Sequence, residues 1–278
     1  IKVAIMNKVS VLIATTPRLA LRSEHALPSV INQTCQPKAV VLVSDTRSLD
    51  RNEVENLRSE LKSIPLRVLV NSRASGAAGS WNTGINYISD NFPNSYIAII
   101  DDDDVWQPEH LSSCLLSSDD GKADIVLSGI NVKIDHKTVA TNIPIDLEVK
   151  DFLVGNPGWQ GSNTFIKTEL ATKVGGFTDG LTSGNDKDFA IRILESGLVT
   201  IRYTNMATVD WICNQTPDAL SAPGSKQKLR GCAQFLKLHG EKMSQSEMDI
   251  YFERAAALFA LSKNDILDEI KLLESVNG

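Results

Sequence analysis

Short runs of branched apolar residues recur along the first hundred positions of the chain, separated by turn residues and amphipathic stretches. Runs that are apolar at nearly every position are typical of strands buried on both faces of a parallel sheet. The stretches between them have helical spacing, so the pattern predicts βαβ units with right-handed crossovers. The predicted strands cover residues 9–14, 38–44, 66–70 and 96–100, with helices ending near 32, over 50–62 and from 76 onward.

The pattern loosens after Pro108, where the strand-like pieces are shorter and less regular. We therefore predict an α/β fold, a mixed, mainly parallel sheet flanked by helices, with a C-terminal helical extension. Apolar positions at helical spacing from Ser225 onward predict two or three helices, packed on the domain or, in a homodimer, on a second copy of the chain. Further strands are expected at 124–128, 131–134, 164–167 and 198–203, and a helix at 185–196.

Four consecutive carboxylates, Asp101 to Asp104, follow the fourth predicted strand. In open α/β sheets the carboxyl ends of the strands face the ligand crevice, and alternation places Asp101 and Asp103 on one side. Clustered carboxylates repel one another unless a cation lies between them, and Mg²⁺ or Mn²⁺ carrying substrate phosphates meets that need. A solvated turn is the alternative. A calcium loop of the EF-hand type is excluded, because Trp106 stands where that loop requires Gly.

The composition is that of a globular chain of 278 residues, with 42% hydrophobic and 22% charged residues. A net charge of -6 provides no basic field for nucleic acid, and no apolar run reaches the roughly eighteen residues of a transmembrane segment. Four widely spaced cysteines without a Cys-x-x-Cys pair indicate neither a zinc site nor a disulfide framework, so we expect a cytoplasmic protein. No signal peptide is visible, and peripheral association with a membrane stays open.

Six segments stand out in order along the chain: the first two predicted strands with the residues that end them, the small-residue helix start at Gly76, the acid tetrad with its strand, the glycine turn Gly175-Gly176-Phe177, and residues 185–188. In order and spacing they resemble family 2 glycosyltransferases of the GT-A fold, over roughly residues 9–215. The resemblance implies that a sugar moves, with inversion, from a nucleoside diphosphate donor of UDP or TDP type to a hydroxyl of a saccharide or glycolipid acceptor. It also implies a divalent metal, Mn²⁺ or Mg²⁺, and by analogy a role in bacterial surface-polysaccharide or glycoconjugate assembly. We expect a glycosyltransferase domain over 1–220, with a nucleotide-binding half (1–107) and an acceptor-binding half (108–220), before a helical extension over 221–278. The matching segments are residues 9–15, 41–45, 76–84, 99–106, 175–177 and 185–188.

The resemblance assigns donor-binding roles to residues near the ends of the predicted strands. Asp45 would accept the ring N–H of a pyrimidine base, unless it only caps the following turn. Asp103 would hold the metal that neutralises the leaving diphosphate, and Asp104 would orient the loop before Pro108. The other expected donor contacts are Ala14 and Thr15 at the base, Asp101 and Asp102 near the ribose and diphosphate, and Asn82 at the glycine-rich helix start.

Asp186 is the expected general base, which takes the proton of the acceptor hydroxyl as that oxygen attacks the anomeric carbon. On its predicted helix it shares a face with Phe189 and Ala190, which directs its carboxylate toward the interior or a cleft. Asp188 lies four residues before Arg192 and is expected to form an ion pair on the helix surface. The alternative for Asp186 is an acidic residue that complements the helix dipole.

The segment 155–163 is expected to contact the acceptor. Trp159 would stack on a sugar face, and Gln160 or Asn163 would bond its hydroxyls; a turn built around a buried Trp is the alternative.

Three positions depart from the family pattern. Trp81 stands where an Arg usually precedes Asn82, Asn185 replaces a Glu beside the base, and the segment 211–214 lacks the His that often follows the last strand. These departures leave open a nucleotide-sugar or glycan-binding module with weakened catalysis. A sugar-phosphate nucleotidyltransferase is disfavoured, because no glycine-rich loop with a Lys/Arg signature follows the first strand.

Overall fold

The parallel half of the sheet forms as the apolar runs predict. The computed structural model describes residues 8–16, 25–213 and 224–276. Strands β3 (Leu66–Val70), β2 (Ala39–Ser44), β1 (Val9–Thr15) and β4 (Tyr96–Asp101) lie side by side in that order, all parallel. Leu12 in β1 lies opposite Val41 and Ile99, and all three are fully buried. Burial on both faces explains why β1, β2 and β4 are apolar at nearly every position, whereas the edge strand β3 is partly exposed and carries Arg67.

The other half of the sheet is mixed. Strand β8 (Thr164–Lys167) is antiparallel to β4 and to β6 (Ile125–Ile134), and β6 runs parallel to β9 (Ile201–Ile212). Strands β5 (Val105–Trp106) and β7 (Lys137–Asn142) pair antiparallel with β9 and β6. The sheet as a whole has the mixed, mainly parallel arrangement expected, with helices on both faces.

Two strand boundaries differ from the prediction. The pieces expected at 124–128 and 131–134 form one strand, because Gly129 lets β6 pass close to β9: a Cβ there would lie 3.1 Å from the Cα of Ala207. Strand β9 continues well past residue 203, where the prediction ended, since its pairing with β6 and β5 supports residues that carry no apolar run.

Helices cover both faces of the sheet and define two apolar clusters. One cluster contains residues of α3 (Ala26–Ile31), α4 (Arg51–Leu61) and α6 (His110–Ser117). The other contains residues of α5 (Ala77–Asn91), α7 (Val149–Val154), α8 (Thr168–Lys173) and α9 (Asn185–Glu195). The helices expected over 50–62 and 185–196 are therefore confirmed. The helix expected between residues 15 and 32 lies partly outside the described residues, and its described part is α3.

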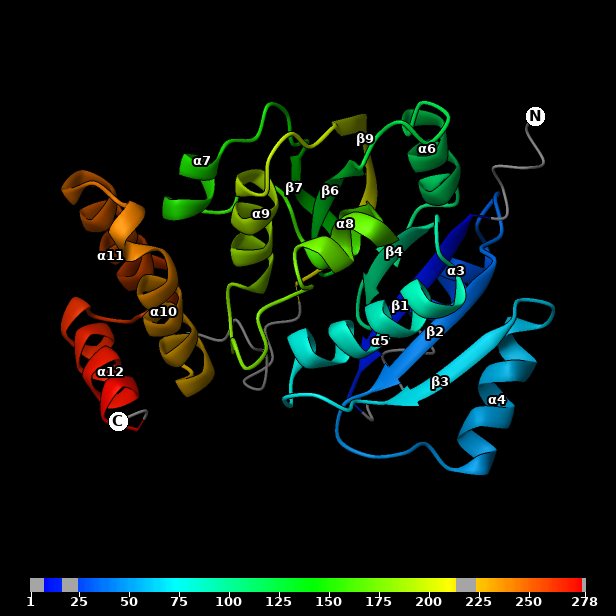
Figure 1. Ribbon diagram of the computed structural model, residues 1–278, viewed down its shortest axis with the longest axis horizontal. Helices are drawn as coiled ribbons and strands as arrows, with labels where there is room; N and C mark the ends of the chain where they lie inside the picture. Colours follow the sequence, from blue (N-terminus) through cyan, green and yellow to red (C-terminus); the bar gives the residue numbers. More distant parts are fainter. Residues whose placement is uncertain (1–7, 17–24, 214–223, 277–278) are drawn as a thin grey trace.

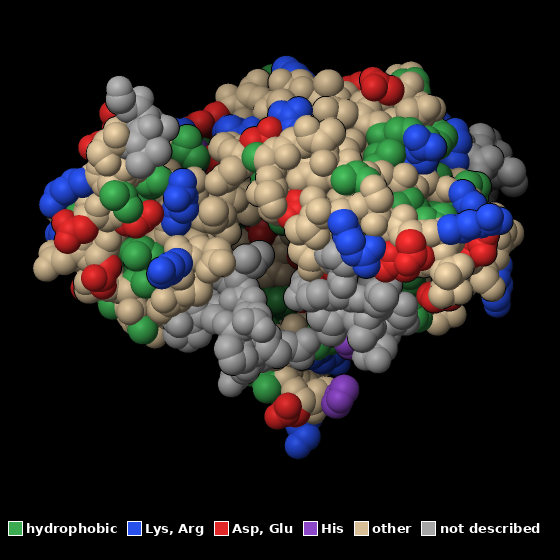
Figure 2. Space-filling view, turned by 90° about the horizontal axis from the view of Figure 1, so that it is seen from below, with side chains coloured by type: hydrophobic (Ala, Val, Ile, Leu, Met, Phe, Trp, Pro, Cys, Tyr) green, Lys and Arg blue, Asp and Glu red, His purple; other side chains and the backbone are tan. Residues whose placement is uncertain are grey.

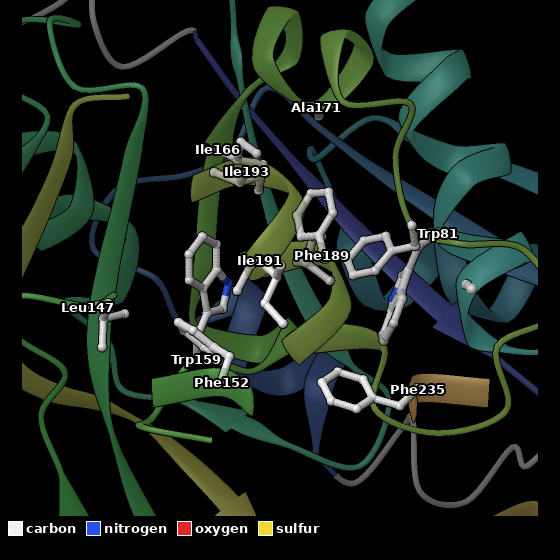
Figure 3. Packing of buried hydrophobic residues seen from close by; sticks show 14 of the residues in the cluster. Trp81, Leu147, Phe152, Trp159, Ile166, Ala171, Phe189, Ile191, Ile193 and Phe235 are labelled. Atoms are coloured by element: carbon white, nitrogen blue, oxygen red, sulfur yellow. The ribbon is translucent and has the colours of Figure 1, made fainter. Parts of the chain in front are cut away.

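The C-terminal helices α10 (Lys226–His239), α11 (Gln245–Phe259) and α12 (Lys263–Val276) gather at the end of the molecule opposite β3 and α4 (Figure 1). Short 3₁₀ turns occur at Gly161–Asn163 and Gly240–Lys242. Phe235, Tyr251 and Ile266 from these helices belong to the same buried cluster as Phe189 in α9 (Figure 3). The helical extension therefore packs on the α/β domain, which is one of the two arrangements expected from the sequence. Its separation as a unit stays a prediction.

Apolar side chains also remain exposed on these helices, among them Leu238, Leu258 and Leu272. The homodimer that the sequence analysis expects through these helices therefore stays a prediction. Within the described part of the chain, every helix is too short or too polar to span a bilayer.

Candidate active site

The acid tetrad bends sharply at the carboxyl end of β4, and Ser162 holds the bend. The hydroxyl of Ser162 accepts the N–H of Asp101 at 3.0 Å and donates to the carboxylate of Asp104 at 2.5 Å. Asp104 also accepts the N–H of Ile212 at 3.1 Å. Burial, with repulsion from Asp103, raises the pKa of Asp104 to about 8. Asp104 therefore ties the loop to β9, in line with the orienting role expected for it.

Asp102 and Thr15 bond to each other. Asp102 is 4% exposed and accepts the hydroxyl of Thr15 at 2.5 Å, which joins the ends of β4 and β1. Beside them Ala14 is half-buried at the end of β1. The structure therefore brings these three expected donor-binding residues together at one edge of the sheet.

Asp101, Asp103 and Asp186 also converge, although Asp186 is far from the tetrad in the sequence. Burial, and then repulsion from Asp104, Asp103 and Asp186, raises the pKa of Asp101 well above its ordinary value. Within the described residues, no three His, Cys, Asp or Glu side chains lie close enough to hold a metal by themselves. Any cation here would need ligands from a substrate as well.

Asp186 lies in the first turn of α9, beside Gly161. Its Oδ1 is buried and has no hydrogen-bond partner among the described residues, and the same is true of Nε1 of Trp81. A Cβ at Gly161 would lie 3.2 Å from the Trp81 ring and 3.3 Å from a carboxylate oxygen of Asp101. Burial raises the pKa of Asp186 to about 7, although the Gly161 N–H and Lys228 act in the opposite direction. Buried polar atoms without partners that cluster in one place indicate a site for a ligand.

Asp188 is buried, not on the helix surface as predicted. The ion pair with Arg192 is present, with the two charged atoms 2.9 Å apart, but the Asp188 side chain is only 1% exposed. Nε2 of His239 in α10 lies 2.9 Å from Oδ1 of Asp188. The hydroxyl of Thr178 donates to the other oxygen, Oδ2, at 2.7 Å. Burial acts to raise the pKa of Asp188, but the bonds from His239 and Arg192 outweigh burial and lower it. Asp188 holds α9 against α10, which leaves Asp186 as the acid of the first turn of α9 that is not committed to an ion pair among the described residues.

Asp45 caps the segment that leads into α5. Its carboxylate accepts the N–H of Gly76 and the hydroxyls of Ser75 and Ser80 at 2.9 to 3.1 Å, and the amide of Asn71 at 2.7 Å. Burial acts to raise the pKa of Asp45, but these donors outweigh burial and lower it. Asp45 thus binds the segment before α5 and not the turn that directly follows it, and contact with a nucleotide base stays a prediction.

Asn82 does not point a free amide into the crevice, contrary to the prediction. It is 2% exposed; its amide nitrogen donates to Phe177 O and to Asp179 at 2.8 Å each, and its oxygen accepts the Phe177 N–H at 2.7 Å. These three bonds hold α5 against residues 177–179, which follow the glycine turn before α9. The neighbouring Trp81 contacts Phe177 in a tilted arrangement, with ring centres 4.5 Å apart, and Phe177 stacks on Phe189 of α9. Figure 3 shows Trp81 and Phe189 in this cluster. The Trp found in place of an Arg therefore packs between these helices.

Two of the three expected acceptor contacts are closed off by packing. Trp159 is fully buried in the core, where its Nε1 donates to Thr164 at 2.8 Å (Figure 3). Asn163 is also fully buried and donates to the carbonyls of Ser128 and Gly158. The alternative of a turn with one buried Trp is therefore correct, and direct acceptor contact by these two side chains is corrected. Gln160 stays half-buried at the site.

Sequence analysis missed a group of cations beside Asp186. A cavity of about 280 Å³ has Asp186 in its wall and is lined by Lys187, Lys228 and Arg254 as well. It lies among α7, α9, α10 and α11. Figure 2 shows a hollow between the C-terminal helices and the part of the molecule that contains the sheet. No local pattern marks these residues, since they meet only when α10 and α11 fold onto α9.

Comparison with known structures gives the same fold. The chain is similar to a structure of residues 1–349 of TarS from S. aureus in complex with UDP-GlcNAc, with 16% identity and a TM-score of 0.65 over 92% of this chain and 74% of that one. A longer TarS structure matches with 17% identity and a TM-score of 0.59 over 93% of this chain but only 44% of that one. The mannosyltransferase PcManGT from Pyrobaculum calidifontis, in complex with GDP-Man and Mn²⁺, matches with 17% identity and a TM-score of 0.59, over 97% and 75%.

Comparison with curated protein sequences gives no significant match. A family model described as glycosyl transferase family 2 matches residues 10–178, which include β1, the acid tetrad and the glycine turn before α9. Because this model spans more than half of the chain, the chain belongs to glycosyl transferase family 2 and is a glycosyltransferase that uses a nucleotide-sugar donor.

Proposed function

We propose that this glycosyltransferase transfers its sugar with inversion to a hydroxyl of a saccharide or glycolipid acceptor, and that Asp186 is the general base. The observation that carries this proposal is the buried Oδ1 of Asp186, which lacks a partner among the described residues. It adjoins the space bounded by Gly161, Trp81 and Asp101. A pKa of about 7 suits a carboxylate that must take up a proton near neutral pH.

In the proposed reaction, the acceptor hydroxyl bonds to Asp186 and its oxygen attacks the anomeric carbon opposite the leaving group. A carbon–oxygen bond forms to the acceptor, the bond to the diphosphate breaks, and the hydroxyl proton moves to Asp186. Trp81 and Phe177 form an apolar wall beside the base. Such a wall excludes water that would otherwise compete with the acceptor.

The nucleotide of the donor is proposed to bind at the ends of β1, β2 and β4. Ala14, Thr15 and Asp45 would contact the base, and Asp101 and Asp102 the ribose and diphosphate. The support is their location at one edge of the sheet, where open α/β sheets bind nucleotides. A UDP or TDP donor is favoured by the sequence. The UDP-GlcNAc and GDP-Man seen with the two similar proteins make both nucleotide classes worth testing.

Asp103 is proposed to hold a divalent metal, Mn²⁺ or Mg²⁺. The residues fit such an ion, because repulsion among Asp101, Asp103 and Asp104 would be relieved by a cation, and Mg²⁺-like ions need only one or two protein carboxylates. When bound, the ion would neutralise charge on the leaving diphosphate. The mannosyltransferase with Mn²⁺ supports this choice of metal.

One alternative keeps a specific observation in its favour. Asn185 Oδ1 is buried without a partner among the described residues, at the position where the family has a Glu. A module that binds nucleotide sugars but turns them over weakly therefore stays an alternative function. The family assignment favours transfer over a sugar-phosphate nucleotidyltransferase.

We also propose a reducing compartment, the cytoplasm, because all four cysteines are free thiols. By analogy with the family, we propose a role in polysaccharide assembly.

Calorimetric titration with UDP, GDP, CDP and TDP, each with and without Mn²⁺, tests the donor proposal. We expect one nucleotide to bind in a metal-dependent way and Asp103→Ala to abolish that dependence. If no nucleotide binds with metal present, the proposed function is wrong. Binding without turnover of any donor sugar would favour the weakly catalytic module. The anomeric configuration of the product, read by NMR, decides inversion.

A further inference from the structure

A cationic cavity lies beside Asp186. Its volume is about 280 Å³, and its walls come from the end of α7, the start of α9, and the facing sides of α10 and α11. Asp186 is in the wall, whereas Asp101 to Asp104 are not. A group bound in this cavity would therefore lie beside Asp186 without contacting the acid tetrad. Gly155 and Asn156, the first residues of the segment expected to contact the acceptor, are also in the wall.

The lining carries three cations and one carboxylate. Lys187, Lys228 and Arg254 face a cavity in which Asp186 is the sole acidic residue among the lining side chains. Across the described residues, no ion pair involves any of these three cations. Arg254 has no hydrogen-bond partner there either, and its guanidinium lies beside Gly155, whose added Cβ would be 3.5 Å from it.

Aromatic rings hold the two lysines in place of acids. The Lys187 ammonium lies 3.8 Å from the centre of the Phe235 ring and 5.2 Å from that of Tyr251. The Lys228 ammonium lies 3.9 Å from the Phe259 ring and donates to Ser183 at 3.0 Å. Ring faces attract cations, but they return only part of the hydration energy that a buried charge loses.

The charges in this cavity are therefore poorly compensated by the protein itself. Burial, with repulsion from Lys228 and Arg254, lowers the pKa of Lys187 to about 7. Burial also lowers the pKa of Lys228. Two half-buried lysines and an exposed arginine thus face one carboxylate, and an incoming anion would supply the missing compensation.

We propose that this cavity receives an anionic group, a phosphate or a carboxylate, carried by the acceptor saccharide. Lys187, Lys228 and Arg254 bind the anion, and the aromatic side chains contact the sugar that carries it. The acceptor hydroxyl then lies at Asp186. This inference rests on the proposed function and specifies its acceptor: the enzyme selects anionic acceptors over neutral ones.

The test is an NMR titration of the full chain with a matched set of sugars. The probes are methyl glucoside, glucuronic acid, glucose 6-phosphate and inorganic phosphate, each added with and without the nucleotide that binds best. We expect at least one anionic sugar to bind about tenfold more tightly than the neutral glucoside, as one charge-assisted hydrogen bond provides. Comparison of glucuronic acid with glucose 6-phosphate tells a carboxylate from a phosphate.

Variants locate the binding site. Lys187→Gln and Arg254→Gln are each expected to weaken binding of the anionic sugar about tenfold and to leave the neutral sugar unchanged. Lys226→Gln is the matched control, because Lys226 lies exposed on the same helix as Lys228 and outside the cavity. Arg254 is exposed, so its variant stays informative even if Lys187→Gln fails to fold.

The outcomes separate this inference from the proposed function. If a nucleotide binds but anionic and neutral sugars bind equally, the inference is overturned and the glycosyltransferase proposal stands. The inference is also overturned if the anionic sugar competes with the nucleotide, because the cations then serve the donor diphosphate. If anionic sugars bind through Lys187 and Arg254 while no nucleotide binds, the cavity is retained and the proposed function fails.

Discussion

Replacing Asp186 by Asn removes a proton acceptor while it keeps the size and shape of the side chain. A positioned general base contributes roughly 10²- to 10⁴-fold, so we expect kcat to fall by that factor, which corresponds to about 3 to 5 kcal/mol in the activation barrier. Because Asp186 Oδ1 has no partner among the described residues, the Asn side chain breaks no known bond. Binding of the donor should therefore stay unchanged.

The pH profile gives a second, independent signature. The base works when it is ionised, and burial raises the pKa of Asp186 to about 7. The rate of the parent enzyme should therefore fall about tenfold for each pH unit below that value, as the carboxylate is protonated. The residual activity of Asp186→Asn should lack this acid limb.

The assay measures initial rates of product formation from pH 5 to pH 9 with saturating donor. Glu195→Gln is the matched control, because Glu195 lies at the other end of α9 and, among the described residues, bonds only to Lys242, at 2.8 Å. A rate for Asp186→Asn above one tenth of the parent's, or an acid limb that persists in this variant, would refute the assignment of the base.

Two further predictions concern the supports of the site. Asp188→Ala removes the shared partner of Arg192 and His239, and we expect the free energy of unfolding in urea to fall by about 3 kcal/mol. Asp268→Ala, which loses only an exposed pair, should shift the urea midpoint little, and equal shifts in both variants would contradict this reasoning. Gly176→Ala places a methyl group 2.1 Å from Asn82 Oδ1 at a φ of +69°, so we expect a clearly lower melting temperature and reduced transfer activity. If Gly176→Ala had the melting temperature of the wild type, as followed by circular dichroism, the glycine turn would tolerate a side chain and this prediction would be wrong.

The strands of the parallel half and the place of the acid tetrad follow from the sequence by itself. Strands β1, β2 and β4 are nearly continuous apolar runs because both of their faces are buried, so local composition identifies them, and the partly exposed edge strand β3 is still mostly apolar. The tetrad comes directly after such a run, and parallel strands open onto a crevice at that end. Resemblance in six ordered segments points to Asp186 as the expected base, which lies beyond the residues 10–178 that the family model matches.

Only the tertiary structure decides what each polar side chain binds. Asn82, Trp159 and Asn163 have the chemistry of ligand-binding residues, yet packing supplies them with protein partners, in the case of Asn82 at a carbonyl 95 positions away. Asp188 is buried for the same reason, since α10 brings His239 against it. The sequence carries the donors and acceptors of each side chain, whereas the partner depends on contacts between distant elements. The cationic cavity beside the base is the clearest case, because it exists only where four helices meet.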